Sequence, residues 1–425
     1  MVKKGFIYFK HLDFFKHLEF WILIGIFLVY VFLRFYDLEN RTPFGWDQVT
    51  NAWVVKGLLV DHRFPLIGPV AKLNSGIYVG PLYYYYLAIF YFITHLDPIA
   101  AGWSSACASI FTFITLFYVT RKIFSINVAV IAVLIHTVSH YAIVFDRIPW
   151  PVNFIFPLSL LVFYSLYNVL MGKEKYILLL SLFAGLAFNM HFTAIFFPIY
   201  IILSIPLFPR TKGTLKYIVL GIPLFIIFLV PNIIYEISTH SSTAKSFSGY
   251  MKDYNHGFHL VRFLQLKNDA LIELESTLYF KITRVIEYLI FPVFIFFLNF
   301  KKISRSTIVI SYLFSLWFII PWIIFTLYSG EITNYYFSLT RPFAVIILAY
   351  LLSKIFEIKS FIPKIAVTVL LIYYSYLNIS TYFSDNINSL SVQRIQTLSK
   401  IQAGVKVEFR EGVPESYIYY YYTHK

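Results

Sequence analysis

Asp47 is the side chain best placed, by type and by position, to act as a base. It lies in the segment Phe44–Gln48, directly after the first long apolar stretch. Moving a sugar from a phosphate carrier requires a base that deprotonates the acceptor hydroxyl, whereas the phosphate leaves without protonation, so one carboxylate suffices. Glycoside hydrolases use two. The alternative interpretation is structural: Asp47 caps a helix that begins at Gln48.

A second polar group lies in the turn Asp146–Asn153, between two apolar stretches. Arg147 can hold a phosphate through a bidentate contact, because the guanidinium fork matches two phosphate oxygens. Trp150 adds an apolar face and Asn153 a hydrogen-bonding amide. The alternative is a solvated turn in which Asp146 and Arg147 form an exposed ion pair.

Asn189 and His191 interrupt an apolar stretch where two expected spans meet. Polar groups at this depth are costly unless they face the interior of a helix bundle, which favours a functional role. A structural hydrogen bond between helices is the alternative. His136 and His140 have a four-residue spacing that is compatible with a metal site, but we interpret them as hydrogen-bonding groups between helices.

Motifs for other chemistries are missing from the sequence. It contains no glycine-rich phosphate loop, which would support a nucleotide-sugar donor. It also contains no G-x-S-x-G elbow and no HExxH helix, which would support hydrolase chemistry. A donor carried by a lipid fits better. No cofactor is implied, and a requirement for a divalent cation is left open.

The composition indicates an all-α integral membrane protein. Of the 425 residues, 59% are hydrophobic and 13% are charged, about half the charged share of a soluble domain. Apolar stretches recur from Phe20 to Phe383, which predicts about 11–13 transmembrane helices. The net charge is +14, and the Lys and Arg residues lie in the loops between these stretches. This distribution is typical of the cytoplasmic loops of a membrane protein and not of a nucleic-acid-binding surface. The single cysteine, Cys107, allows no intrachain disulfide.

The basic loops predict the orientation. If Met1–Leu33 is an uncleaved first helix with a cytoplasmic start (Lys3, Lys4, Lys10, Lys16) and Pro81–His95 does not cross, the short basic loops all lie in the cytoplasm. Residues 1–383 then form the membrane domain, and its outer loops 34–80 and 238–283 lie on the extracytoplasmic side with a tail of residues 384–425. Asn127–Phe145 is expected to be one span. In the tail we expect a helix at Val392–Ile401 and strands at Val405–Phe409 and Tyr417–Tyr422.

The order of the motifs resembles that of the GT-C membrane glycosyltransferases, specifically the dolichyl-phosphate-mannose protein mannosyltransferase and aminoarabinose transferase group (glycosyltransferase family 39-like). The resemblance covers the first half of the chain, and beyond Thr211 it is one of hydropathy only. Its elements are Asp47, Gly80-Pro81-Leu82-Tyr83-Tyr84, Arg147-x-x-Trp150-x-x-Asn153 and Asn189-x-His191-Phe192.

The chain departs from this family in two places. Many relatives have Asp-Glu where Asp47-Gln48 stands, and the lysine that often precedes the Pro-Leu-Tyr element is absent, so Lys72 or Arg63 would replace it. The resemblance implies a GT-C helix bundle with a long first outer loop and an inverting transfer in which Asp47 is the catalytic base. Residues assigned to substrate binding are Gln48, Lys72, Tyr83, Arg147, Trp150, Asn153, Asn189, His191 and Arg341.

The sequence thus predicts a glycosyltransferase of the cell membrane, with a cytoplasmic N-terminus and an extracytoplasmic site. The donor is a polyprenyl-phosphate-linked sugar, and the acceptor hydroxyl belongs to a protein, a lipid or a glycan. Two alternatives are a lipid or sugar transporter or flippase, and a polysaccharide polymerase or ligase. A transporter would often show inverted repeats, which we do not find. A polymerase or ligase is favoured by a large outer loop late in the chain, and here the long loops are early and central.

Overall fold

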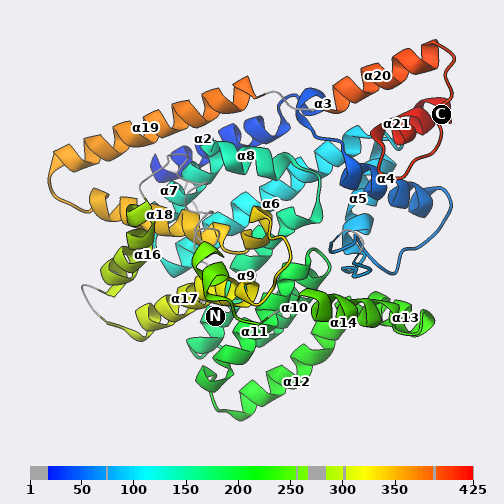
Figure 1. Cartoon of the computed structure of the whole chain (residues 1–425). Helices are drawn as coiled ribbons and strands as arrows, with labels where there is room; N and C mark the ends of the chain where they lie inside the picture. The colour runs from blue at the N-terminus through cyan, green and yellow to red at the C-terminus, as the bar shows by residue number, and fades with distance from the viewer. Residues whose placement is uncertain are drawn as a thin grey trace, which may run out of the picture.

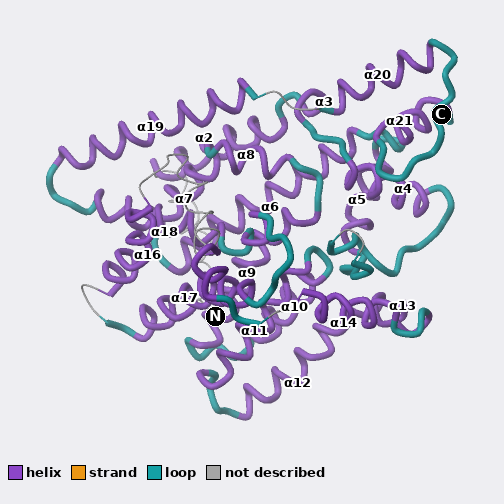
Figure 2. The backbone as a smooth tube through the Cα atoms, in the orientation of Figure 1, coloured by secondary structure: helices purple, strands orange, loops and turns teal. Residues whose placement is uncertain are grey.

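The computed structural model describes residues 18–72, 75–254, 257–266, 284–299, 303–385 and 389–424. Helices joined by loops build this part of the chain, as Figure 1 shows. Pairing of the β type is limited, within these residues, to the isolated bridges Pro43–Ser389 and Val70–Tyr78, and Figure 2 accordingly shows no strand. The all-α class is therefore confirmed. The N-terminal lysines and parts of the outer loop 238–283 lie outside the described residues.

The first half of the chain supplies the inner helices of the bundle. Its helices are α2 (Leu18–Phe35), α3 (Leu38–Arg41), α4 (Trp46–Leu59), α5 (Leu82–Ile93), α6 (Ile99–Ile123), α7 (Ile126–Val138), α8 (His140–Arg147), η2 (Pro151–Phe154), α9 (Ile155–Leu170), α10 (Tyr176–Phe188), η3 (Phe192–Ile195), α11 (Phe196–Ser204) and η4 (Ile205–Leu207).

The second half adds the remaining helices of the bundle, the buried helix α18 among them, and ends in a short helical tail. Its helices are α12 (Lys212–Ile226), η5 (Ile227–Leu229), α13 (Val230–Ser238), α14 (Ser242–Tyr254), α16 (Arg284–Asn299), α17 (Arg305–Thr326), η6 (Asn334–Phe337), α18 (Arg341–Phe356), α19 (Phe361–Ser384), α20 (Leu390–Gln402) and α21 (Pro414–Thr423).

Burial separates inner helices from peripheral ones. Most side chains of α9 and α18 are buried, whereas α12 and α19 lie at opposite edges of the bundle in Figure 1 and expose apolar side chains such as Leu215 and Ile372. Apolar surface of this extent is unfavourable in water but is what a helix in contact with lipid presents. The peripheral helices therefore mark the lipid-facing side.

Several helices have the length and composition of membrane spans. Within the described residues, five segments are long and apolar enough: Ile99–Ile123, Pro151–Leu170, Lys212–Ser238, Arg305–Thr326 and Phe361–Ser384. A bent pair, α7 with α8, makes a sixth if it is counted as one span, and shorter apolar helices accompany them. The total of 11–13 spans stays a prediction.

The expected span Asn127–Phe145 is not one continuous helix. The helix breaks at Ser139, and α7 and α8 meet there at an angle of 69°. Ser139 Oγ accepts from the amide of Ala142 and so caps the start of α8, while Asn378 Oδ1 of α19 accepts from the amide of His140 at 2.8 Å. Side-chain acceptors thus replace the helical hydrogen bonds, which hydropathy alone does not reveal.

The C-terminal tail is helical where a strand was expected. Val392–Ile401 lies in α20 as expected, Val405–Phe409 is irregular, and Tyr417–Tyr422 belongs to α21. Tyr417 and Tyr421, four residues apart, are both buried, which is a helical spacing. The strand preference of tyrosine is overridden by packing, because one face of α21 covers Trp53 of α4.

Candidate active site

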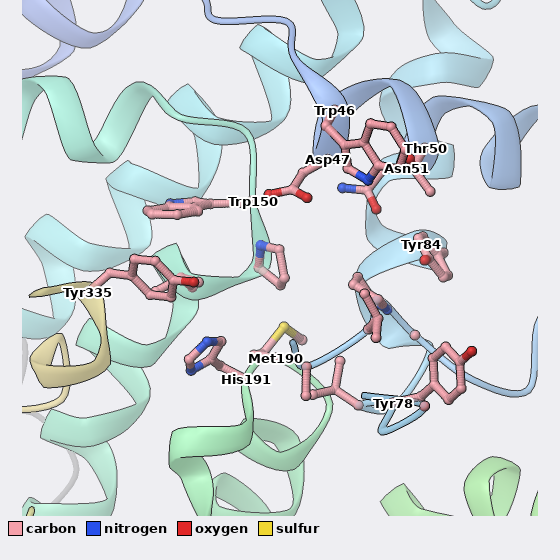
Figure 3. Close-up of a pocket in the computed structure, with 18 of the residues that line it drawn as sticks. Trp46, Asp47, Thr50, Asn51, Tyr78, Tyr84, Trp150, Met190, His191 and Tyr335 are labelled. Atoms are coloured by element: carbon pink, nitrogen blue, oxygen red, sulfur yellow. The ribbon is translucent and has the colours of Figure 1, made fainter. Parts of the chain in front are cut away.

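A polar cavity of about 400 Å³ lies where the start of α4, the loop before α5, the turn before α9 and the bend after α10 meet. Figure 3 shows the side chains that surround it. Its lining residues come from seven separate segments of the chain: Trp46, Asp47, Thr50, Asn51, Gly68, Pro69, Val70, Ala71, Gly76, Tyr78, Val79, Tyr84, Trp150, Pro151, Val152, Met190, His191, Tyr335 and Glu411.

Asp47 points into this cavity from the first turn of α4, beside Trp150, as Figure 3 shows. Asn51, one turn further along the helix, lines the same wall. The side chain is open to solvent, but the concave wall around it removes part of the water, and this desolvation raises the pKa of the Asp47 carboxyl above its usual value. A carboxylate with a raised pKa is a stronger base that remains in reach of a substrate.

The interpretation of Asp47 as a helix cap is wrong. Helix α4 begins at Trp46, and Gln48 supplies the cap: its Oε1 accepts from the amide of Gly45 at 2.9 Å. Gln48 Nε2 donates to the carbonyl of Pro149 at 3.1 Å, and the side chain is buried. Gln48 therefore does not line the cavity. It joins α4 to the turn that carries Trp150, and Asp47 is left free of a capping role.

Trp150 and Asn153, in the turn between α8 and α9, form a hydrogen-bonded pair. Trp150 lines the cavity, while Asn153 is buried behind it and its Oδ1 accepts from Trp150 Nε1 at 2.8 Å. Asn153 Nδ2 donates to the backbone oxygens of Asp146 and Ile148. Asn153 thus positions the indole, and of the two only Trp150 faces the cavity.

Arg147 is not brought to the cavity. The side chain is buried, and Nη1 donates to the carbonyls of Leu33, Arg34 and Tyr36 at 2.8–3.1 Å, at the end of α2. A cation at the C-terminal end of a helix compensates the partial negative charge of the free carbonyls. The guanidinium thereby fastens α8 to α2, so Arg147 serves the architecture of the site.

The alternative of a solvated Asp146–Arg147 turn is also wrong. Asp146 is buried and pairs with Arg34 of α2, with 3.0 Å between Oδ2 and Nη2. His136 Nε2 lies 3.3 Å from the same carboxylate oxygen, and His140 contacts Asp385 instead. The two histidines therefore face different carboxylates. The predicted hydrogen bond between helices is confirmed for His140, whereas neither ring nitrogen of His136 completes a hydrogen bond within the part of the chain that the structure describes. The described residues contain no group of three or more His, Cys, Asp or Glu side chains arranged to hold a metal ion.

Asn189 and His191 occupy different positions at the same bend. Asn189 is fully buried, lines neither cavity, and donates to the carbonyls of Gly185 and Phe228. It thus forms the structural hydrogen bond that was the alternative to a substrate-binding role. His191 lines the cavity opposite Asp47 in Figure 3. Its Nδ1 lies 2.9 Å from Thr193 Oγ1 and 3.4 Å from the amide nitrogen of Thr193; when Nδ1 accepts from these two donors, Nε2 carries the ring N–H. Burial lowers the His191 pKa to about 3, so the ring is neutral.

Beside the polar cavity lies a second, mainly apolar one of about 430 Å³. The two share Ala71, Tyr78 and Val79 in their walls. The walls of the second cavity come mainly from the loop before α5, from η3, α11 and α14, and from the end of α17 with the residues that follow it. Among the described residues they carry one Lys or Arg side chain, Lys72. Lys72 Nζ donates to the hydroxyl of Tyr328 at 3.0 Å and to the carbonyl of Glu331. The pair of cavities thus combines a polar chamber, an apolar chamber and a cation.

The remaining assigned residues lie away from both cavities. Tyr83 is buried in the core of α5, and its neighbour Tyr84 lines the polar cavity instead. Arg341 is buried at the start of α18, where its guanidinium stacks 3.6 Å above the ring of Phe145 and Nη2 donates to the hydroxyl of Tyr141. Asn51 could have been found by its spacing from Asp47. Tyr335 and Glu411 could not, because the resemblance does not extend to their part of the chain.

Comparison with known proteins agrees with this architecture. A family model described as dolichyl-phosphate-mannose-protein mannosyltransferase matches residues 78–235. ArnT from Cupriavidus metallidurans, solved with undecaprenyl phosphate, superposes with a TM-score of 0.59 over 95% of this chain and 75% of ArnT, at 10% identity. The chain has the GT-C fold. The motif elements that carried the resemblance, apart from Asp47, lie within the matched residues.

A second GT-C structure gives the same result. AglB, the oligosaccharyltransferase of Archaeoglobus fulgidus solved with an inhibitory peptide and a dolichol-phosphate, superposes with a TM-score of 0.59 over 96% of this chain at 13% identity. The chain spans 60% of the length of AglB. A comparison with curated protein sequences gives no match. With its apolar helices and the GT-C fold, the chain is a multi-pass membrane protein.

Proposed function

We propose that the chain transfers a sugar from a polyprenyl-phosphate carrier to an acceptor hydroxyl. The observation that carries this proposal is the position of Asp47, whose carboxylate faces a polar cavity that adjoins an apolar cavity lined by Lys72. A lipid-linked sugar has three parts that match these surfaces: an apolar chain for the apolar cavity, an anionic phosphate for Lys72 and a polar sugar ring for the polar cavity.

The apolar cavity suits the first isoprenoid units of the carrier. It is lined by aromatic and aliphatic side chains such as Phe192, Phe196 and Ile199, and Lys72 offers an ammonium group for the phosphate near the wall shared with the polar cavity. Two proteins with the same fold were solved with lipid phosphates, ArnT with undecaprenyl phosphate and AglB with dolichol-phosphate. This supports a lipid-linked donor for the present chain.

The polar cavity then holds the sugar and the acceptor. The acceptor oxygen attacks the anomeric carbon from the face opposite the phosphate, the bond from that carbon to the phosphate oxygen breaks, and its electron pair leaves with the polyprenyl phosphate. Asp47 takes the proton of the acceptor hydroxyl. One displacement of this kind inverts the anomeric configuration, and Lys72 stabilises the charge that grows on the leaving phosphate.

Neutral groups orient the sugar. Trp150 presents an indole face that can stack on a sugar ring, and the N–H of His191 Nε2 can donate to a ring hydroxyl, because burial keeps this imidazole uncharged. By the positive-inside rule, the basic loops favour a cytoplasmic N-terminus, with the loop that contains Asp47 on the extracytoplasmic side. The site therefore works at the outer membrane face, which a lipid carrier reaches laterally.

Release of free polyprenyl phosphate from a panel of polyprenyl-phosphate sugars tests the proposal, with the purified full-length protein in lipid nanodiscs. Asp47→Asn is expected to lower turnover by about 10²–10⁴-fold, the range for loss of a general base. Asp61→Asn is the matched control, because Asp61 follows the same helix but pairs with Lys56 at the surface. Unchanged turnover in Asp47→Asn would remove this carboxylate from the mechanism.

Lys72→Met tests the donor side separately. Loss of the ammonium group is expected to raise the KM for the lipid donor and lower turnover, because the phosphate loses its counter-charge. Lys56→Met, at an exposed ion pair outside both cavities, is the control. Equal kinetics of the Lys72 variant and the unmodified protein would place the phosphate elsewhere.

A further inference from the structure

The C-terminal tail contributes a carboxylate to the polar cavity. Glu411, in the loop between α20 and α21, lines it together with Asp47. Its neighbour Gly412 has a φ of 70° and lies flat against Trp46: a Cβ at Gly412 would lie 2.1 Å from Trp46 Cε3. Only glycine fits both the left-handed backbone and this approach. The loop that carries Glu411 is thereby seated on the residue that precedes Asp47.

Polar contacts hold the tail on the membrane domain. Arg394 of α20 pairs with Asp97 in the loop before α6, and its Nε lies 2.7 Å from Glu39 of α3. From α21, the Tyr421 hydroxyl donates to Asp97 Oδ2 at 2.8 Å and the Tyr417 hydroxyl donates to the carbonyl of Leu96 at 3.2 Å. Ion pairs and buried tyrosines therefore fix α20 and α21, and with them the loop of Glu411.

The lining of the polar cavity is negatively charged. Asp47 and Glu411 are its only formally charged side chains among the described lining residues, and His191 is neutral because it is buried. Lys72, the cation of the donor side, lines the neighbouring apolar cavity. Glu411 is next to Gly412, which lies against Trp46, so Glu411 lines the cavity near the start of α4, where Asp47 takes the proton of the acceptor in the proposed reaction.

This inference rests on the proposed function. We propose that Glu411 determines acceptor specificity, so that the cavity takes a neutral or cationic hydroxyl compound and disfavours an anionic one. Two carboxylates in a concave wall repel a third negative group, and repulsion of the wrong partner is an efficient source of specificity. They also keep the donor phosphate on the Lys72 side. Glu411 thus acts as a charge filter and leaves the proton transfer to Asp47.

The charge of the cavity can be measured without any transfer reaction. Quenching of tryptophan fluorescence by caesium and by iodide compares a cation with an anion, and the difference between the unmodified protein and Trp46→Phe isolates the signal of Trp46, which is exposed beside Glu411. In Glu411→Lys the caesium-to-iodide ratio of quenching constants is expected to fall by about threefold or more. Glu411→Gln should give a smaller fall in the same direction.

Glu408→Lys is the matched control, because Glu408 lies three residues earlier, is exposed and does not line the cavity. It makes the same charge change and should leave the ratio within error of the unmodified protein. An unchanged ratio in Glu411→Lys, or an equal fall in Glu408→Lys, overturns the proposal. This readout is independent of whether the chain moves a sugar.

Transfer to small alcohols then tests specificity directly. Ethanolamine, ethylene glycol and glycolate are similar in size, carry one primary hydroxyl or more, and differ in charge. The unmodified protein is expected to use glycolate about tenfold less well than ethylene glycol, and Glu411→Lys to remove this difference. Equal use of glycolate and ethylene glycol by the unmodified protein would contradict the role of Glu411 in acceptor specificity.

The two proposals can fail separately. Donor turnover that does not depend on Asp47 would contradict the proposed function, while the quenching experiment would still determine the charge of the cavity.

Discussion

Trp150 and Asn153 form a hydrogen bond of 2.8 Å in which the indole Nε1 donates to the amide Oδ1. Asn153 Nδ2 in turn donates to the backbone oxygens of Asp146 and Ile148, so one buried amide closes the turn and fixes the indole. The position of the cavity wall beside Asp47 therefore depends on a residue that does not itself line the cavity.

Asn153→Ala is expected to loosen this wall. The variant leaves the indole N–H and two backbone carbonyls without their partner, which costs about 1–3 kcal/mol of stability when such groups stay buried. Thermal unfolding measures the loss, and the KM for the lipid donor should rise because Trp150 is no longer held. Asn40→Ala, whose amide bonds Asp37 at the surface, is the control and should change little. Equal effects of the two variants would show that the turn does not depend on Asn153.

The approach of Gly80 to Asn189 joins two motif elements. A Cβ at Gly80 would lie 1.9 Å from Asn189 Oδ1, and Asn189 cannot withdraw because its Nδ2 is held by the carbonyls of Gly185 and Phe228. Gly80→Ala is expected to lower the free energy of unfolding by about 1–3 kcal/mol through overpacking.

Gly57→Ala is the matched control for this contact. A Cβ at Gly57 meets nothing within 4 Å, and the residue lies inside α4, so alanine should stabilise the helix by about 0.5–1 kcal/mol. The two substitutions thus have opposite expected signs in the same unfolding experiment. A neutral or stabilising Gly80→Ala would show that the two elements are not in close contact.

Parts of the site could be predicted from the sequence because they rest on local chemistry. Asp47, Trp150 and His191 are polar or aromatic residues at the ends of apolar stretches, and the structure brings all three to one cavity. Arg147 is also a polar residue at the end of an apolar stretch, but its guanidinium donates to carbonyls at the C-terminal end of α2. These carbonyls have no partner within the helix and therefore attract a nearby cation. Only the tertiary arrangement separates these two uses.

The same limit applies to the fold. Hydropathy predicted the helical bundle, because a membrane requires internal hydrogen bonding of the backbone. It did not predict the break at Ser139, where side-chain acceptors replace helical bonds, or the helix α21, which packs one face of a tyrosine-rich segment on α4. Glu411 was missed because its role depends on where the tail is seated, and no local pattern encodes this contact.

Gln48→Glu tests the departure from the family motif. The substitution restores the second carboxylate of Asp-Glu, but in this chain the side chain is buried and its Nε2 donates to the carbonyl of Pro149. A carboxylate there would face that carbonyl without a proton, so we expect a loss of about 1–3 kcal/mol in thermal unfolding and no gain in turnover. Gln396→Glu, exposed on α20, is the control. A stable and more active Gln48→Glu would show that the position still accepts a catalytic carboxylate.

The pH dependence of transfer should report the desolvation of Asp47. The base must be unprotonated, so kcat/KM falls as the pH decreases through the pKa of this carboxyl in the free protein. Because the surrounding wall raises that pKa above its ordinary value of 3.8, the midpoint of the acid limb is expected above 3.8, with a plateau at higher pH. The pH–rate profile of polyprenyl phosphate release measures this midpoint, with circular dichroism at each pH to show that the protein stays folded.

Asp61→Asn is the control for this profile and should keep the same midpoint, since Asp61 lies outside the cavity. A midpoint at or below 3.8 would mean that the wall does not desolvate the base, and Asp47 would then lack the environment that the mechanism assigns to it.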